Sequence, residues 1–198
     1  MITKRVFDLF FSVIGLLFLI PVFLLIAIWI KLDSPGPVIF RQVRVGRFGE
    51  PFRIFKFRTM RSEGEGSGKL ITVRDDIRIT RAGRFLRRYK LDELPQLLNV
   101  VKGEMSLVGP RPEVPRYVTL YPDIVREKVL SVPPGMTDFA SIEYIDENSL
   151  LLDADDPETV YIERVMPAKL RNCERYVTER SIGMDLKIIL ATVKAIVS

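Results

Sequence analysis

Two adjacent carboxylates, Asp92 and Glu93, are the residues of this sequence best suited to chemistry. They lie in the segment LDELPQLLNV, where Pro95 and the apolar residues after it indicate the start of a helix. Carboxylates at the mouth of a helix can hold a divalent metal, and one of them can present an oxygen as a nucleophile. Sequence neighbours do not share a helix face, which favours different roles for the two. The alternative is structural, with Asp92 capping the helix and Glu93 lying favourably along its dipole.

Basic residues in two other segments could bind phosphate. Arg111 lies between Pro110 and Pro112 in the segment SLVGPRP, and the two prolines restrict the backbone from which its guanidinium projects. A guanidinium held in a set direction suits bidentate phosphate recognition, although the same segment also fits a purely structural loop. Lys56 and Arg58 share one face of a predicted strand with aromatic neighbours.

Composition excludes several other kinds of site. The chain has no His, which removes imidazole as a general base and every metal site that uses it. Its single Cys173 rules out an intramolecular disulfide, and we interpret it as a packing residue. The net charge of +5 suits nucleic acid, an anionic lipid surface or a phosphorylated substrate. Because no recognition-helix or aromatic-basic pattern accompanies the charge, we do not expect nucleic acid binding.

The first thirty-three residues predict a membrane-embedded helix. The run from Leu9 to Ile30 has no charged residue, and at about 1.5 Å per residue it is long enough to cross the hydrocarbon core. Trp29 lies near its end, where interfacial aromatics are common, and no small-x-small cleavage site follows. Pro21 removes a ladder hydrogen bond near the middle of the run, so the residues fit either a kinked span or a re-entrant segment.

The remaining residues, 34–198, predict one small helix-rich α+β domain with little sheet. Two short strands are expected over Val38–Gly46 and Phe52–Arg58, the second with one cationic face, and a polar, glycine-rich loop over Arg61–Lys69. Ile77–Tyr89 has a helical pattern with a basic face, which suits solvent or a membrane surface. A last helix over Ile182–Val197 carries an apolar stripe that fits either the domain core or the membrane interface. The stripe consists of Ile182, Leu186, Ile189, Leu190, Val193 and Val197.

Taken together, these segments resemble the monotopic phosphoglycosyltransferases, the bacterial sugar transferase family that includes undecaprenyl-phosphate glycosyl-1-phosphate transferases. The resemblance runs over nearly the whole chain and depends on five motifs in a fixed order. They are KRVFD at residues 4–8, FKFRTM at 55–60, LDELPQ at 91–96, GPRP at 109–112 and MDLKI at 184–188. Each motif is weak alone, but the ordered set is specific.

The resemblance implies a fold, a reaction and a site. It implies a re-entrant membrane element broken at Pro21, with residues 34–198 forming a catalytic domain on the cytoplasmic face of the bacterial inner membrane. It implies Mg²⁺, a UDP-sugar donor and a polyprenyl phosphate acceptor, with UMP released through a covalent aspartyl phosphosugar. Asp92 would be the nucleophile and Glu93 a base or metal ligand, with both carboxylates near the metal. Further positions that match the family's substrate-binding groups are Lys56, Arg87, Arg111 and Asp185.

Two departures and two rival functions accompany this prediction. Ile20 stands before Pro21 where relatives often carry Ser, and the stretch Pro134–Ser141 replaces a Gly-Trp-containing run. The enzymatic rival is a glycosyltransferase that uses Asp153 and Asp155 as a metal-binding D-x-D pair and releases UDP. The other is a non-catalytic membrane-bound module, which would leave Asp92-Glu93 and the GPRP segment unexplained.

Overall fold

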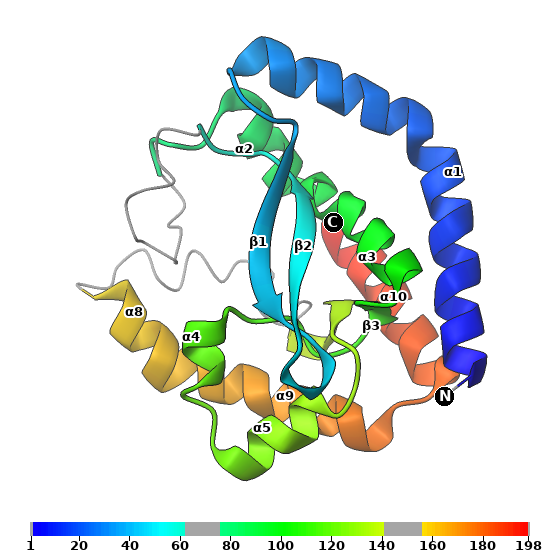
Figure 1. Cartoon of the computed structure of the whole chain (residues 1–198), viewed down its shortest axis with the longest axis vertical. Helices are drawn as coiled ribbons and strands as arrows, with labels where there is room; N and C mark the ends of the chain where they lie inside the picture. Colours follow the sequence, from blue (N-terminus) through cyan, green and yellow to red (C-terminus); the bar gives the residue numbers. More distant parts are fainter. Residues whose placement is uncertain (1, 62–75, 141–155, 198) are drawn as a thin grey trace.

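The computed structural model describes residues 2–61, 76–140 and 156–197 and has a helix-rich α+β fold, as predicted (Figure 1). The predicted glycine-rich loop lies largely outside these residues, and the D-x-D pair lies wholly outside them. The described elements are α1 (Ile2–Asp33), β1 (Ile39–Val45), η1 (Arg47–Gly49), β2 (Pro51–Phe57), α2 (Arg81–Arg88), η3 (Leu91–Gln96), α3 (Leu97–Lys102), β3 (Ser106–Val108), α4 (Pro115–Val118), α5 (Asp123–Leu130), β4 (Gly135–Thr137), α8 (Pro157–Val160), η4 (Tyr161–Val165), α9 (Met166–Glu179) and α10 (Ile182–Val197).

Helix α1 continues through Pro21 and arches along one side of the domain (Figure 1). Figure 1 shows it bent partway along, and a proline in a helix interior is a common cause of such a bend. Among the described residues, α1 is the helix that is long and apolar enough to cross a membrane. Only 11% of its apolar window is buried by the domain, so it is not the core helix of a soluble protein.

Both ends of α1 are fixed to the rest of the chain by polar contacts. Near the N-terminus, the guanidinium of Arg5 donates hydrogen bonds to the carbonyls of Val100 (2.5 Å) and Val101 (2.9 Å) on α3. At the other end, the buried Arg58 guanidinium donates to the carbonyl of Ser34 at 2.6 Å. Arg58 therefore holds the exit of α1 and does not lie on an exposed cationic strand face.

The hairpin of β1 and β2 is the larger of the two described sheets, and each sheet has two strands. Its antiparallel register places Phe40 opposite Lys56 and Arg44 opposite Phe52. Both strands lie within a residue or two of their predicted positions. The predicted cationic face of β2 is wrong, however, because Ile54 and Phe57 point to opposite faces and both are buried.

Strands β3 and β4 pair in parallel, and the GPRP segment directly follows β3. Gly109 and Gly135 touch at the crossing: a Cβ added to Gly135 would lie 2.0 Å from the Gly109 nitrogen. The Gly109 nitrogen donates to the carbonyl of Thr137 (3.1 Å), and the Gly135 nitrogen donates to the carbonyl of Pro110 (2.9 Å). Only residues without a side chain allow this approach, so both glycines help to fix the loop that carries Arg111.

Helix α2 begins later than the predicted Ile77. The Thr80 hydroxyl accepts a hydrogen bond from the Gly83 nitrogen and caps the helix, while the Asp76 carboxylate holds Arg78 in a turn before it. Gly83 lies against the chain just after β2, where an added Cβ would be 2.1 Å from the Thr59 carbonyl oxygen. This close packing brings the last turn of α2 to the end of β2.

Helix α10 covers the predicted residues, but its buried face is not the predicted stripe. Asp185 and Ile188 are buried, whereas Leu186, Leu190 and Val193 are exposed. Ile188 packs with Val108 and Tyr176 in one of the core clusters. The buried polar residue Asp185 therefore lies on the core-facing side, which local hydrophobic periodicity assigns to solvent.

Apolar packing joins the helices to the hairpin in several clusters. One cluster combines Ile26 and Ile30 of α1 with Phe57 of β2 and Leu86 of α2. Another gathers side chains of α4, α5, η4 and α9, and Cys173 is buried within it, as expected of a packing residue. Its burial raises the pKa of the Cys173 thiol well above the usual range, so the group is a poor nucleophile.

Candidate active site

Asp92 lies inside the 3₁₀ turn η3 and does not cap a helix. The residue before that turn, Lys90, has a left-handed backbone (φ 54°), and no side chain caps the turn. Asp92 is 8% exposed, and its carboxylate accepts no hydrogen bond from any residue that the structure describes. The capping explanation of this residue is therefore wrong, because the N-cap positions of η3 and α3 are Lys90 and Gln96. A buried carboxylate that accepts no hydrogen bond from the described residues costs stability.

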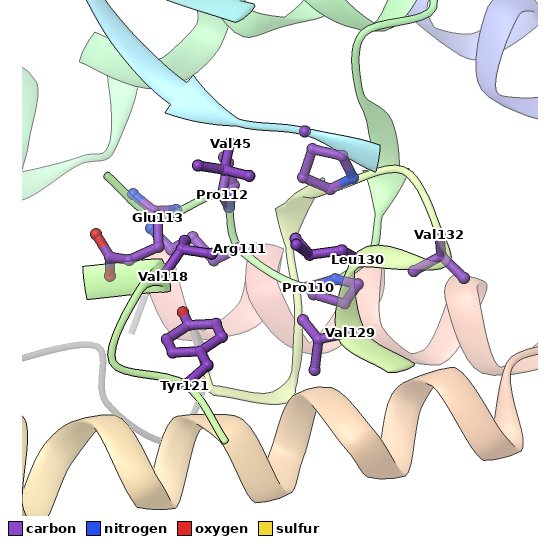
Figure 2. Close-up of a pocket in the computed structure, with 12 residues that line it drawn as sticks. Val45, Pro110, Arg111, Pro112, Glu113, Val118, Tyr121, Val129, Leu130 and Val132 are labelled. Carbon is purple, nitrogen blue, oxygen red and sulfur yellow. The ribbon is translucent and has the colours of Figure 1, made fainter. Parts of the chain in front are cut away.

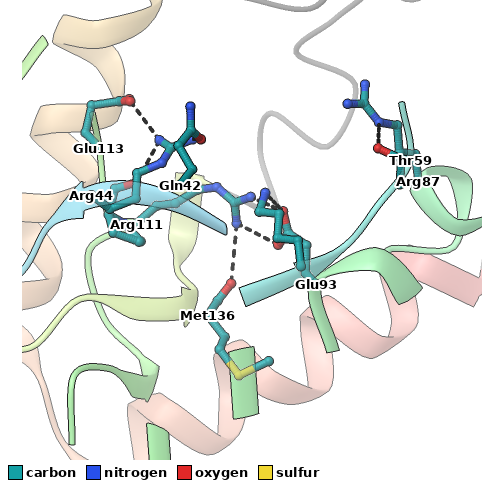
Figure 3. Close-up of polar contacts among 10 residues, drawn as sticks. Gln42, Arg44, Thr59, Arg87, Glu93, Arg111, Glu113 and Met136 are labelled. Atoms are coloured by element: carbon teal, nitrogen blue, oxygen red, sulfur yellow. Dashed lines mark hydrogen bonds and ion pairs between the residues drawn. The ribbon is translucent and has the colours of Figure 1, made fainter. Parts of the chain in front are cut away.

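Unlike Asp92, Glu93 accepts hydrogen bonds at both of its carboxylate oxygens (Figure 3). The ammonium of Lys56 donates to its Oε1 at 2.8 Å, and the Arg111 guanidinium donates to both oxygens, at 3.0 Å to Oε2. Burial alone would raise the pKa of Glu93, but the charges and hydrogen bonds of Arg111 and Lys56 outweigh it. They hold that pKa well below its usual range.

Three separate elements bring cationic side chains to these carboxylates. Lys56 comes from β2, Arg111 from the GPRP loop, and Arg87 from the last turn of α2, where its Nε donates to the Thr59 hydroxyl at 2.9 Å (Figure 3). The structure therefore gathers five of the six predicted residues, Asp92, Glu93, Lys56, Arg87 and Arg111.

The environment of Asp92 favours reactivity over structural pairing. Burial raises the pKa of its carboxyl, and the neighbouring Glu93 charge adds to the effect, while Lys56, Arg87 and Lys90 only partly oppose it. A carboxylate with little solvation and no hydrogen-bond donor keeps its lone pairs available to an incoming electrophile. The nearby cations would balance negative charge on a bound phosphate.

Asp185, the sixth predicted residue, lies in a different cluster. Its carboxylate is 2.6 Å from the Lys4 ammonium and 2.8 Å from the Tyr176 hydroxyl. Lys4 also lies 3.7 Å from Asp8, whose other oxygen accepts from the Ser106 hydroxyl at 2.7 Å. Asp185 thus ties the first turn of α1 to α9 and α10, and no described contact links it to Asp92 or Glu93.

Sequence reasoning missed a second polar group behind Arg111. The half-buried Arg44 guanidinium donates to Glu113 (3.0 Å), to the Pro112 carbonyl (3.2 Å) and to Gln42 (2.8 Å), as Figure 3 shows in part. Glu113 also accepts from the Tyr161 hydroxyl at 2.5 Å. These contacts hold the far side of the GPRP loop. The signal was present, because Gln42 and Arg44 alternate on the strand face that carries Lys56.

The Pro134–Ser141 stretch also supports Arg111 through its described part. The Asp138 carboxylate accepts from the Arg111 backbone nitrogen at 3.2 Å, and the Met136 carbonyl accepts from its guanidinium at 3.5 Å (Figure 3). This stretch departs from the family pattern in sequence, yet it positions the predicted phosphate-binding side chain.

The cavity beside the GPRP loop is too small to hold a substrate. Its volume is about 20 Å³, and Figure 2 shows Arg111, Glu113 and Tyr121 among the residues around it. That volume matches a single water molecule. A second pocket of about 620 Å³ lies between η1, α4 and α5, but none of the six predicted residues lines it. A donor that reaches Asp92 must therefore bind in neither of these two pockets.

Comparisons with known proteins confirm the predicted family. The model of the bacterial sugar transferase family matches residues 1–198. An exopolysaccharide production protein PSS of Rhizobium leguminosarum bv. phaseoli is 41% identical over 98% of this chain and 94% of its own length. A UDP-glucose:undecaprenyl-phosphate glucose-1-phosphate transferase of Caulobacter vibrioides is 38% identical over 98% of this chain and 70% of its own.

A relative with a different sugar in its name is also similar. The UDP-N-acetylgalactosamine-undecaprenyl-phosphate N-acetylgalactosaminephosphotransferase of Aeromonas hydrophila is 35% identical over 98% of this chain, which spans 44% of its length. Because the family model covers the chain from end to end and these relatives align with nearly all of it, the protein is an enzyme of the bacterial sugar transferase family.

Proposed function

We propose that this enzyme transfers a sugar-1-phosphate from a UDP-sugar to a polyprenyl phosphate such as undecaprenyl phosphate. The names of the relatives support these donor and acceptor classes. The observation that carries the proposal is the Asp92 carboxylate, which is buried and unpaired among the described residues although cationic side chains surround it. A group that costs stability in this way is best explained by catalysis.

The reaction that fits this site has two steps. An oxygen of Asp92 attacks the β-phosphorus of the UDP-sugar, and the bond from that phosphorus to the bridging oxygen breaks, releasing UMP. A phosphate oxygen of the polyprenyl phosphate then attacks the phosphorus of the aspartyl phosphosugar. The bond to Asp92 breaks, which restores the carboxylate and leaves the sugar on a polyprenyl diphosphate.

Lys56, Arg87 and Arg111 would stabilise the phosphate charge during both steps. Glu93 holds Lys56 and Arg111 side by side before substrate arrives, so the cations are already oriented. Its low pKa makes Glu93 a weak proton acceptor, which favours this positioning role over general base catalysis.

Of the two carboxylates, Asp92 is the better candidate ligand for the proposed Mg²⁺. No group of three possible metal ligands (His, Cys, Asp or Glu) occurs within the described part of the chain, but Mg²⁺ commonly uses one or two carboxylates together with substrate phosphates. Asp92 fits that requirement because no described residue bonds to its oxygens, whereas those of Glu93 are held by Lys56 and Arg111. When bound, the ion would neutralise charge on the diphosphate and on the leaving UMP.

The attachment of α1 supports a re-entrant segment on the cytoplasmic face of the inner membrane. A straight helix of 32 residues would be about 48 Å long, so its ends would emerge on opposite sides of a core about 30 Å thick. Yet Arg5 near one end and Ser34 beyond the other both bond to the same domain. Apolar side chains in the middle of the helix are exposed, for example Phe18 at 79% and Leu25 at 69%.

Topology gives a direct prediction. Cysteines introduced at Ile2 and Glu50, both exposed, should be labelled only from the cytoplasmic side, because a re-entrant α1 returns to the side it enters from. The measurement is labelling of intact cells with an impermeant thiol reagent, and the buried Cys173 provides a silent background. Labelling of the Ile2 position from outside would mean that α1 spans. Pro21→Ala should favour that outcome by restoring the missing ladder bond.

Turnover with a panel of UDP-sugars and undecaprenyl phosphate tests the proposed reaction. The expected nucleotide product is UMP, detected separately from UDP, and its release should depend on the lipid for continued turnover. UDP as the product would favour the D-x-D glycosyltransferase, and no nucleotide release with any donor would favour a non-catalytic module. Sugar selectivity emerges from the same panel.

A further inference from the structure

The exposed side of α2 combines arginines with aromatic residues. Ala82 and Leu86 are buried, whereas the remaining side is built from Arg81, Arg84, Phe85, Arg88 and Tyr89, all exposed. At about 100° per residue, Arg84, Arg88 and Arg81 adjoin one another around the helix axis, and Phe85 and Tyr89 follow. The arginines and the aromatics therefore form two adjacent strips on one surface.

The aromatic strip is continuous with α1. The ring of Trp29 lies 5.3 Å from that of Phe85, which lies 4.8 Å from that of Tyr89. All three rings are more than a third exposed. Tryptophan and tyrosine beside an apolar membrane segment are typical of the headgroup layer, so the strip marks the depth at which α2 would meet the lipid surface. Figure 1 shows α2 beside the C-terminal part of α1, while α9 lies at the far side of the domain.

The arginine strip has no ion-pair partner within the part of the chain that the structure describes. None of Arg81, Arg84 and Arg88 forms an ion pair with a described residue, although Arg88 lies over the Tyr89 ring at 5.7 Å. The two nearby carboxylates have other partners: Asp33 accepts from the Ala82 nitrogen at 3.0 Å, and Asp76 binds Arg78. Three positive charges are thus presented outward at the level of the Trp29 ring.

We infer that this surface of α2 binds the headgroups of anionic phospholipids and enriches them around the α1–α2 corner. The inference rests on the proposed embedding of α1, which brings the strip to the membrane. Each arginine near an anionic lipid surface gives about a fivefold preference. Charge complementarity and continuity with the apolar segment both favour lipid as the occupant. A bilayer rich in phosphatidylglycerol should therefore be selected over one of phosphatidylcholine.

The chain's single tryptophan, Trp29, reports on this selection directly. The full-length protein is reconstituted in vesicles of phosphatidylcholine containing increasing brominated phosphatidylglycerol, and in parallel with brominated phosphatidylcholine. Quenching of Trp29 fluorescence by the two lipids gives their relative binding constant beside α2. We expect a preference of about 5- to 25-fold for phosphatidylglycerol, which falls as salt screens the charges.

Matched variants distinguish a local effect of the α2 arginines from an effect of the protein's net charge. Arg84→Gln with Arg88→Gln should lower the preference by about fivefold or more, toward the value that Arg81 alone supports, whereas Arg164→Gln with Arg171→Gln should leave it unchanged. The control pair removes the same charge from exposed positions of η4 and of α9, and α9 lies far from α2. Equal losses in both pairs, or no preference in the wild type, would overturn the inference. If neither lipid quenched Trp29, the embedding of α1 itself would be wrong.

Discussion

Replacing Asp92 by Asn is expected to reduce turnover to background, a loss of roughly 10³-fold or more, because an amide cannot act as the nucleophile. The fold should not suffer. Asp92 caps no helix and forms no hydrogen bond with a described residue, so the substitution removes only a poorly solvated charge. The unfolding temperature should therefore be unchanged or higher. The measurements are UMP release and thermal unfolding of the purified protein.

Labelling tests the same prediction at the level of the intermediate. Wild-type protein incubated with a UDP-sugar labelled in the sugar, without lipid acceptor, should retain label and release about one equivalent of UMP. Asp92→Asn should do neither. Asp123→Asn makes the same chemical change at a carboxylate that is exposed on α5, and should behave like the wild type. An active Asp92→Asn enzyme would overturn the proposed mechanism.

Arg111→Lys is expected to lower kcat/KM by about 10²- to 10³-fold, with the protein still folded. The guanidinium of Arg111 spans both oxygens of Glu93, and a planar fork can exchange one of these contacts for a phosphate oxygen without losing the other. A lysine ammonium is a point charge and cannot reproduce this geometry. The loop should stay in place, because the Asp138 contact is made by the backbone nitrogen of residue 111.

Arg116→Lys makes the same substitution on α4, a few residues after the GPRP loop, and provides the control. Arg116 is 62% exposed and pairs with Glu158 at 2.8 Å on the surface, so its replacement should change the kinetics little. Steady-state kinetics of both variants with one UDP-sugar make the comparison. Near-normal turnover in Arg111→Lys would reduce Arg111 to a residue that shapes the loop.

The site residues were predicted from motifs in a fixed order more than from hydrophobic periodicity. Asp92 and Glu93 were recognisable as adjacent carboxylates at a predicted helix start, and Arg111 as a single charge between two prolines. Their proximity to Lys56 comes from tertiary contacts between β2, η3 and the GPRP loop, which no local pattern encodes. Asp185 shows the reverse case, since its motif matched the family while its carboxylate is used to anchor α1.

Local patterns failed where a buried polar residue decided the packing. The apolar stripe of α10 fitted either the domain core or the membrane interface. The bonds of Asp185 to Lys4 and Tyr176 turn the adjacent face toward the core and leave Leu190 exposed, so the core alternative is wrong. Helix α2 started late because the side chains of Asp76 and Thr80 compete for the backbone. In both places a specific polar contact outweighed an average preference.

The bond between Lys4 and Asp185 joins residues 181 positions apart, so it can form only after α10 has been synthesised. At about 5–20 residues per second, the ribosome completes α10 on the order of ten seconds or more after the first turn of α1 has been made. The apolar segment therefore meets the bilayer before its own N-terminal anchor exists. Closure of the first turn onto α10 therefore follows synthesis of the whole domain between them, so insertion of the apolar segment and assembly of the domain are separate stages in the life of the chain.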